Sequence, residues 1–116
     1  MRTNRAYLQD MLERIARIEQ MASAGKVAFV QSFMYQDTII RNYEVIGEIA
    51  KRLPESLLQQ TPEVPWSDLK GFRDFLSHNY DRVDLEIVWN AVQELPALRH
   101  AVETLLASLP PEMDTQ

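Results

Sequence analysis

Hydrophobic residues recur along this chain at spacings of three and four, the pattern of a helix that buries one face. The first such segment covers residues 3–23. Its apolar line consists of Leu8, Met11, Ile15, Ile18 and Ala22. A second helix is expected over 26–52, because Gly25 is a natural helix stop and Pro54 follows the last periodic residues. Polar positions such as Gln31 and Asn42 leave this second helix a face for solvent.

The second half of the chain keeps the helical period. Prolines punctuate a connection over 53–65, in which residues 55–59 have room for one helical turn. A third helix is expected to begin near Pro65, a residue suited to the first helical position, and to end near His78.

The last helical segment covers 85–109, with Asp84 in the position of its N-cap. Pro96 removes a backbone donor and should kink or split this segment. Short connections between helices favour an all-α, up-and-down bundle of four to five helices. We expect a single domain over 1–109 and a frayed tail over 110–116.

Composition excludes several kinds of chemistry. The 116 residues contain no cysteine, which rules out disulfides, thiolate zinc sites and a cysteine nucleophile. His78 and His100 are the two histidines, and we expect His100 at the surface. Glu44 and Glu48 lack the Glu-x-x-His partners of a di-iron bundle, so the sequence predicts no metal and no other cofactor.

Charge and hydropathy bear on location and partners. The net charge of −5 argues against nonspecific binding of nucleic acid through a broad basic face, so any such contact must be local. The N-terminal residues lack the apolar core of a secretory signal, and no run approaches the ~20 apolar residues of a membrane span. We therefore expect a cytoplasmic protein that makes no membrane contact.

Arg73 occupies an unusual position in the third helix. A helical projection places it beside Trp66 and Leu69, inside the apolar stripe. A buried guanidinium must be paired or must face a cleft, because an unpaired buried charge costs several kcal/mol. Alternatively, the arginine stem lies along the edge of the core and its head reaches water.

A line of charged residues follows one face of the second helix. Asp37, Arg41, Glu44 and Glu48 succeed one another at spacings of four, three and four, between apolar neighbours. The simplest interpretation is an Asp37–Arg41 helix pair with solvated glutamates. The line could instead support a polar site.

Residues 73–80 could form a catalytic corner. On an unbroken helix Arg73 and His78 lie about 140° apart, so they converge with Tyr80 only if the helix ends near His78. Asn79 tolerates the left-handed backbone that such a turn needs. Arginine, histidine and tyrosine suit metal-free cleavage of a phosphodiester, as phosphate ligand, proton-transfer group and positioning residue. The alternative role for His78 is a helix cap or a residue at the core edge.

The spacing Arg73-x4-His78-x-Tyr80 matches the Rx4HxY signature of HEPN-domain ribonuclease toxins, and the chain resembles their HepT-like family. The segment RNYEVIGEIAKRLP at 41–54 is similar to the family's second-helix signature. Pro65-Trp66 and the segment VDLEIVW at 83–89 resemble the flanks of its active corner. The likeness covers about residues 4–108.

The resemblance implies a homodimer of helical bundles that cleaves RNA in a composite cleft without metal. Arg73 would bind phosphate, His78 would act as acid or base, and Tyr80 would be the accessory residue. The resemblance also implies the toxin of a type VII-like toxin–antitoxin system. Its partner nucleotidyltransferase would neutralise it by transferring AMP from ATP onto Tyr80.

Several supporting roles follow from the same resemblance. Asp37, Arg41 and Glu44 could orient Arg73 or the histidine as supporting residues. Asn79 stands where relatives often have glycine. An RNA-cleaving protein of net charge −5 would also need local positive charge, which Arg41, Lys70, Arg73 and Arg82 could supply around the cleft.

Two other functions remain compatible with the sequence. The chain could be a noncatalytic dimeric helical protein that binds a nucleotidyltransferase or serves as its substrate. It could also be a helical adaptor in which Arg73 and His78 are purely structural.

Overall fold

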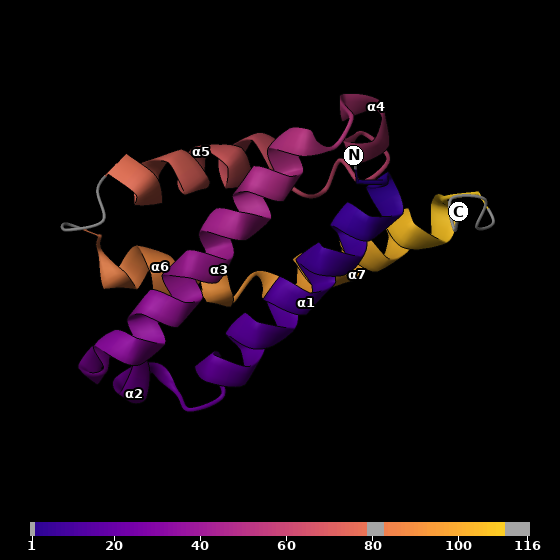
Figure 1. The fold of residues 1–116 in the computed structure, drawn as a ribbon. Coiled ribbons are helices and arrows are strands. Elements are labelled where there is room, and N and C mark those ends of the chain that lie inside the picture. Colours follow the sequence, from indigo (N-terminus) through magenta and orange to yellow (C-terminus); the bar gives the residue numbers. More distant parts are fainter. Residues whose placement is uncertain (1, 79–82, 111–116) are drawn as a thin grey trace.

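Helices make up the described part of the chain. The computed structural model describes residues 2–78 and 83–110, without the side chains of Ser77 and His78. These residues form seven helices and no strand (Figure 1). The helices are α1 (Asn4–Ala22), α2 (Lys26–Gln31), α3 (Phe33–Arg52), α4 (Glu55–Leu58), α5 (Trp66–His78), α6 (Leu85–Val92) and α7 (Leu95–Ser108). The all-α prediction is confirmed, and the predicted number of four to five helices is too low.

The expected second helix is interrupted at Ser32, where the prediction of one helix over 26–52 is wrong. Ser32 has an extended backbone (φ −124°, ψ 114°), and its hydroxyl accepts a hydrogen bond from the Tyr35 backbone at 3.4 Å. The Gln36 side chain donates to the carbonyls of Phe29 and Val30 at 3.0 and 2.9 Å. Because these contacts satisfy backbone groups that a break exposes, two helices replace one at little cost.

The other helix boundaries follow their local signals. Thr3 caps α1 by accepting from the Ala6 backbone at 3.0 Å, and Asp84 caps α6 by accepting from the Glu86 backbone at 2.9 Å. Pro96 lies in the first turn of α7, where its missing donor costs nothing. The predicted split of the last helical segment is therefore confirmed.

The core lies between α1, α3 and α7. Figure 1 shows α1 and α3 side by side, with α5 along α3 on its other side. The buried side chains of these elements include Leu8, Met11, Ile15 and Ile18 of α1, Ile39 and Ile46 of α3, and Leu98, Ala101, Val102 and Leu105 of α7. A bidentate contact of Arg99 with Glu19 joins α7 to α1 at the edge of this core.

Asn42 differs from its expected solvent position. It is buried in α3, where its side chain donates to the Thr38 carbonyl at 2.7 Å and accepts from Arg14 at 3.3 Å. These two bonds satisfy the amide inside the α1–α3 interface.

No helix in the described part of the chain is long and apolar enough to cross a membrane.

Candidate active site

Arg73 lies at a point of close contact between α5 and α3. A Cβ atom on Gly47 would be 2.3 Å from Arg73 Cβ and 3.0 Å from the Leu69 carbonyl oxygen. No side chain fits there, so glycine at position 47 allows the α5 backbone to approach α3. The contact fixes the root of the Arg73 side chain against α3.

The Arg73 guanidinium shares both of its carboxylate partners with other cations. Its Nε lies 3.3 Å from Glu48, which also pairs with Arg52 at 3.1 Å. Its Nη1 lies 3.5 Å from Asp74, which also contacts Lys51. The Arg73 charge is therefore only partly neutralised.

The Arg73 contact with Glu48 is an ion pair and not a hydrogen bond. Arg73 Nε is buried and has no hydrogen-bond acceptor among the described residues, because the approach of Glu48 at 3.3 Å is poorly aligned. The whole side chain is 31% exposed. It combines a partly accessible head with an unused donor, which suits an arginine that binds an anionic ligand.

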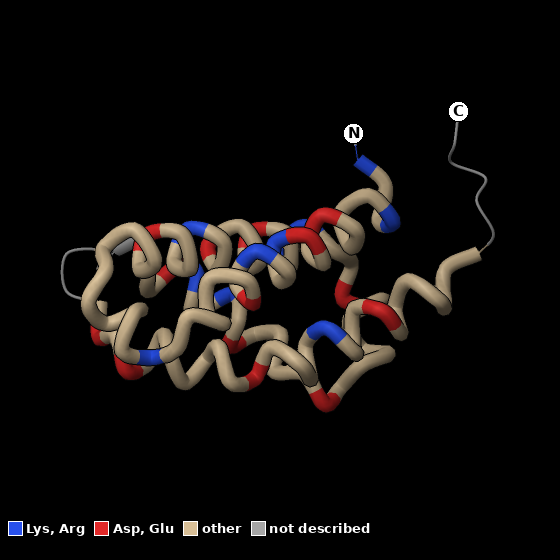
Figure 2. The backbone as a smooth tube through the Cα atoms, turned by 90° about the horizontal axis from the view of Figure 1, so that it is seen from below, with Lys and Arg blue, Asp and Glu red and all other residues tan. Residues whose placement is uncertain are grey.

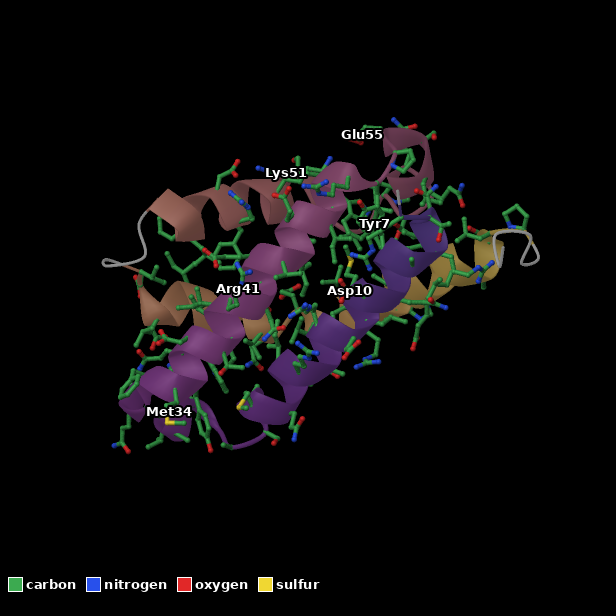
Figure 3. All side chains as sticks on the ribbon, in the orientation of Figure 1. Tyr7, Asp10, Met34, Arg41, Lys51 and Glu55 are labelled. Carbon is green, nitrogen blue, oxygen red and sulfur yellow. The ribbon has the colours of Figure 1, made fainter. Side chains whose placement is uncertain are left out.

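A polar hollow of about 400 Å³ opens beside Arg73, between α1 and α3. We call it the arginine hollow. It is lined by Arg2, Tyr7, Asp10, Arg41, Glu44, Val45, Glu48, Ile49, Arg52 and Arg73. Figure 3 labels Tyr7 and Asp10 on α1 and Arg41 on α3, the helices that border it. Hydrogen bonding to Tyr7 and then to Glu48 raises the pKa of Arg52 above its usual value, so this arginine remains charged.

Only part of the charged line predicted on the second helix lies in this hollow. Arg41, Glu44 and Glu48 line it together with Arg73, whereas Asp37 is exposed on α3 and is not one of the lining residues. Arg41 pairs with Glu44 at 3.7 Å. Among the candidate supporting residues, Arg41 and Glu44 therefore lie in the same hollow as Arg73.

The predicted positive cluster is only partly assembled in the described residues. Arg41 and Arg73 share the hollow, whereas Lys70 reaches Glu55 of α4 at 3.0 Å. Arg82 lies outside the described residues. Figure 2 shows basic positions interspersed with acidic ones along the helices. In the arginine hollow, four arginines meet three carboxylates.

The structure describes the residues on both sides of the corner that follows α5, but not the corner itself. α5 ends at His78, as predicted, and α6 begins at Leu85. The His78 side chain, Asn79 and Tyr80 lie outside the described residues, so their convergence with Arg73 stays a prediction. His100 is exposed on α7, as expected. In the part of the chain that the structure describes, no three His, Asp or Glu side chains gather as metal ligands.

Gly47 and Asp74 were not predicted as site residues, and Glu48 was predicted in the charged line without a role in the site. One signal was available for Gly47, because glycine inside a helix costs about 1 kcal/mol relative to alanine and needs a packing reason. The pairing of Glu48 and Asp74 with Arg73 depends on how α3 and α5 align, which the sequence pattern leaves open.

Comparison with known proteins identifies similar chains. The model of a family described as "Ribonuclease HepT-like" matches residues 11–105. A protein of Thermococcus cleftensis named "Probable ribonuclease HepT" is 33% identical over 108 residues, covering 90% of this chain and 96% of that protein. A "Putative RNase" of Caldanaerobacter subterraneus is 32% identical, covering 91% of this chain and 96% of its own length. No solved structure matches this chain.

Proposed function

Because the chain belongs to the HepT-like ribonuclease family, we propose that it is a metal-independent RNA endonuclease that uses Arg73, His78 and Tyr80. The observation that carries this proposal is the state of Arg73. Its side chain is 31% exposed beside the arginine hollow, and both of its carboxylate partners are shared with other cations. His78 is the last residue of the same helix.

The proposed reaction is an internal displacement at an RNA phosphate. His78 takes the proton of the ribose 2′-hydroxyl, whose oxygen attacks the phosphorus while the bond to the 5′-oxygen breaks. A proton returned to that oxygen gives a 5′-hydroxyl and a 2′,3′-cyclic phosphate. Arg73 stabilises the charge that develops on the phosphate oxygens, and Tyr80 positions the phosphate or stacks on a base.

The proposed enzyme is a homodimer, in which a second copy of the corner supplies a second histidine for proton transfer. Exposed hydrophobic side chains at the α2–α3 junction support a protein interface: Val27, Val30, Phe33 and Met34. This junction lies beside α6, because Lys26 pairs with Glu86 at 2.8 Å. The apolar patch is therefore near the helix that follows the catalytic corner.

We further propose that the protein is the toxin of a type VII-like module, neutralised when a nucleotidyltransferase antitoxin transfers AMP onto Tyr80. An added phosphate would bring negative charge and bulk near Arg73, where RNA phosphate is to bind. The mass of the Tyr80-containing peptide after coexpression with such an enzyme tests this step. An unmodified peptide from a neutralised protein would contradict it.

His78→Ala tests the ribonuclease proposal. We expect the variant to keep its fold and its dimer and to lose RNA cleavage and growth inhibition. His100→Ala is the matched control, because it removes the exposed histidine of α7 and should leave both activities unchanged. Cleavage should also persist in chelator. Unchanged toxicity of His78→Ala would instead favour a noncatalytic partner or substrate of a nucleotidyltransferase.

A further inference from the structure

α5 leaves one of its sides unpacked. It packs along α3, but its contacts with α6 and α7 are sparse. A groove of about 460 Å³ separates these helices, which we call the apolar groove. Its walls are mainly Val64, Leu69, Phe72, Ile87, Leu95 and Leu98. A closed four-helix bundle would fill this space with side chains from facing helices.

Tyr43 contributes an unused polar group to the apolar groove. The residue is 2% exposed, and its hydroxyl has no hydrogen-bond partner among the described residues. Burial, and secondarily the negative charge of Glu94, raises the pKa of Tyr43 above its usual range, so the hydroxyl keeps its proton. Buried hydroxyls are normally paired, and this one belongs to a residue that lines the groove.

The rim of the groove is acidic. Glu63, Asp68 and Glu94 line it, and no lysine or arginine that the structure describes does. In the described ranges 2–78 and 83–110, no ion pair neutralises any of these three carboxylates. The rim therefore attracts positive charge and repels the phosphates of RNA.

We propose that the apolar groove binds an amphipathic helix of a partner protein, with lysine or arginine on both sides of its apolar stripe. The apolar stripe packs between α5 and the α6–α7 side, and the basic flanks pair with Glu63, Asp68 and Glu94. A polar group of the bound helix pairs with the Tyr43 hydroxyl. A second copy of this chain fits less well, because its net charge is −5.

A model peptide tests this proposal on the full chain. The probe is a labelled helix of leucine and lysine about four turns long, with a leucine–glutamate peptide as its charge-reversed counterpart. Anisotropy at near-physiological salt should show binding of the lysine peptide and not of the glutamate peptide. Comparable binding of both peptides, or of neither, would overturn the proposal.

Variants locate the bound peptide. Ile87→Arg places a cation on a 47% exposed wall residue, so the fold should survive while binding weakens at least about tenfold. Ala16→Arg adds the same charge at an exposed position of α1, outside the groove and away from the α2–α3 junction, and should alter binding less than about twofold. Equal effects of the two substitutions would show nonspecific charge attraction and would refute a groove site.

Tyr43→Phe isolates the hydroxyl, because it removes one oxygen and keeps the ring. It should weaken peptide binding about fivefold, the effect of one lost hydrogen bond.

Ile87→Arg should also leave the oligomeric state and RNA cleavage unchanged. Loss of the dimer in Ile87→Arg would instead assign the groove to a second copy of the chain. Since cleavage is measured separately, failure of the groove proposal leaves the ribonuclease proposal standing.

Discussion

The arginine hollow and the apolar groove both use α3 and α5, yet they place opposite chemistry on these helices. The arginine hollow contains four guanidinium groups whose carboxylate partners partly balance them. Among the described residues, the apolar groove is lined by no basic side chain and contains a buried hydroxyl with no hydrogen-bond partner. The first suits an anionic ligand and the second an apolar one with positive charge. Under our two proposals, this separation would let one small domain bind RNA and a protein partner at different places.

Arg73→Ala should produce the largest difference between the two hollows. We expect RNA cleavage to fall by a factor of about 100 or more, because a guanidinium that stabilises phosphate charge is lost. Stability should fall by less than ~1 kcal/mol, since Glu48 keeps Arg52 and Asp74 keeps Lys51. Initial cleavage rates and thermal melting measure the two effects.

The matched control is Arg17→Ala, which removes an arginine paired with Glu13 on the exposed side of α1. It should leave cleavage unchanged. If Arg73→Ala instead unfolds the protein, Arg73 is structural, and this result would favour the interpretation of the chain as a helical adaptor.

Gly47→Ala should have the next largest effect, through packing. A methyl group 2.3 Å from Arg73 Cβ must push α5 away from α3, and such overpacking costs about 1–3 kcal/mol. Displacing Arg73 should also reduce cleavage. Gly71→Ala is the control, because a Cβ on this exposed α5 residue meets nothing within 4 Å. It should stabilise the protein by up to ~1 kcal/mol through helix propensity, as thermal melting would show. Equal destabilisation by both substitutions would refute a specific contact at Gly47.

Tyr43→Phe should have the smallest effect in the free chain. Removing a buried hydroxyl that has no partner in ranges 2–78 and 83–110 should leave stability unchanged or raise it slightly. The difference in stability between the unmodified chain and Tyr43→Phe should grow at alkaline pH. Because the folded pKa of Tyr43 lies above the ordinary 10.0, the unfolded chain releases this proton first, so the free energy of unfolding is unaffected by this titration below pH 10.0 and falls as the pH rises beyond it. Denaturant titrations below and above pH 10.0 measure this loss of stability. The Tyr43→Phe variant should lose less stability over the same pH range, because it has no hydroxyl to titrate at position 43.

The boundaries of most helices could be predicted because each depends on a local signal. Asp84 caps α6, and Pro96 falls in the first turn of α7, as the sequence indicated. Ser32 was missed because the 3.6-residue period continues on both sides of it, and its capping contacts need Gln36 to fold back. Local pattern therefore predicts where helices can form better than where a periodic stretch divides.

The candidate site was predictable in its residue types and less so in its contacts. The position of Arg73 within an apolar stripe already indicated that it must be paired or face a cleft, and both hold. Glu48 and Asp74 became its partners only through the alignment of α3 with α5. Asn42 was expected in solvent but is buried, because its polar face meets Arg14 of another helix.

The sparse packing of α5 against α6 and α7 has a consequence for local unfolding. A helix held mainly along one neighbour can separate from the bundle without melting the α1–α3–α7 core. Amide hydrogens of α5 should therefore exchange with solvent faster than those of α1 and α3. A helix seated in the apolar groove would slow that exchange, and the helix that ends at His78 would spend more time docked.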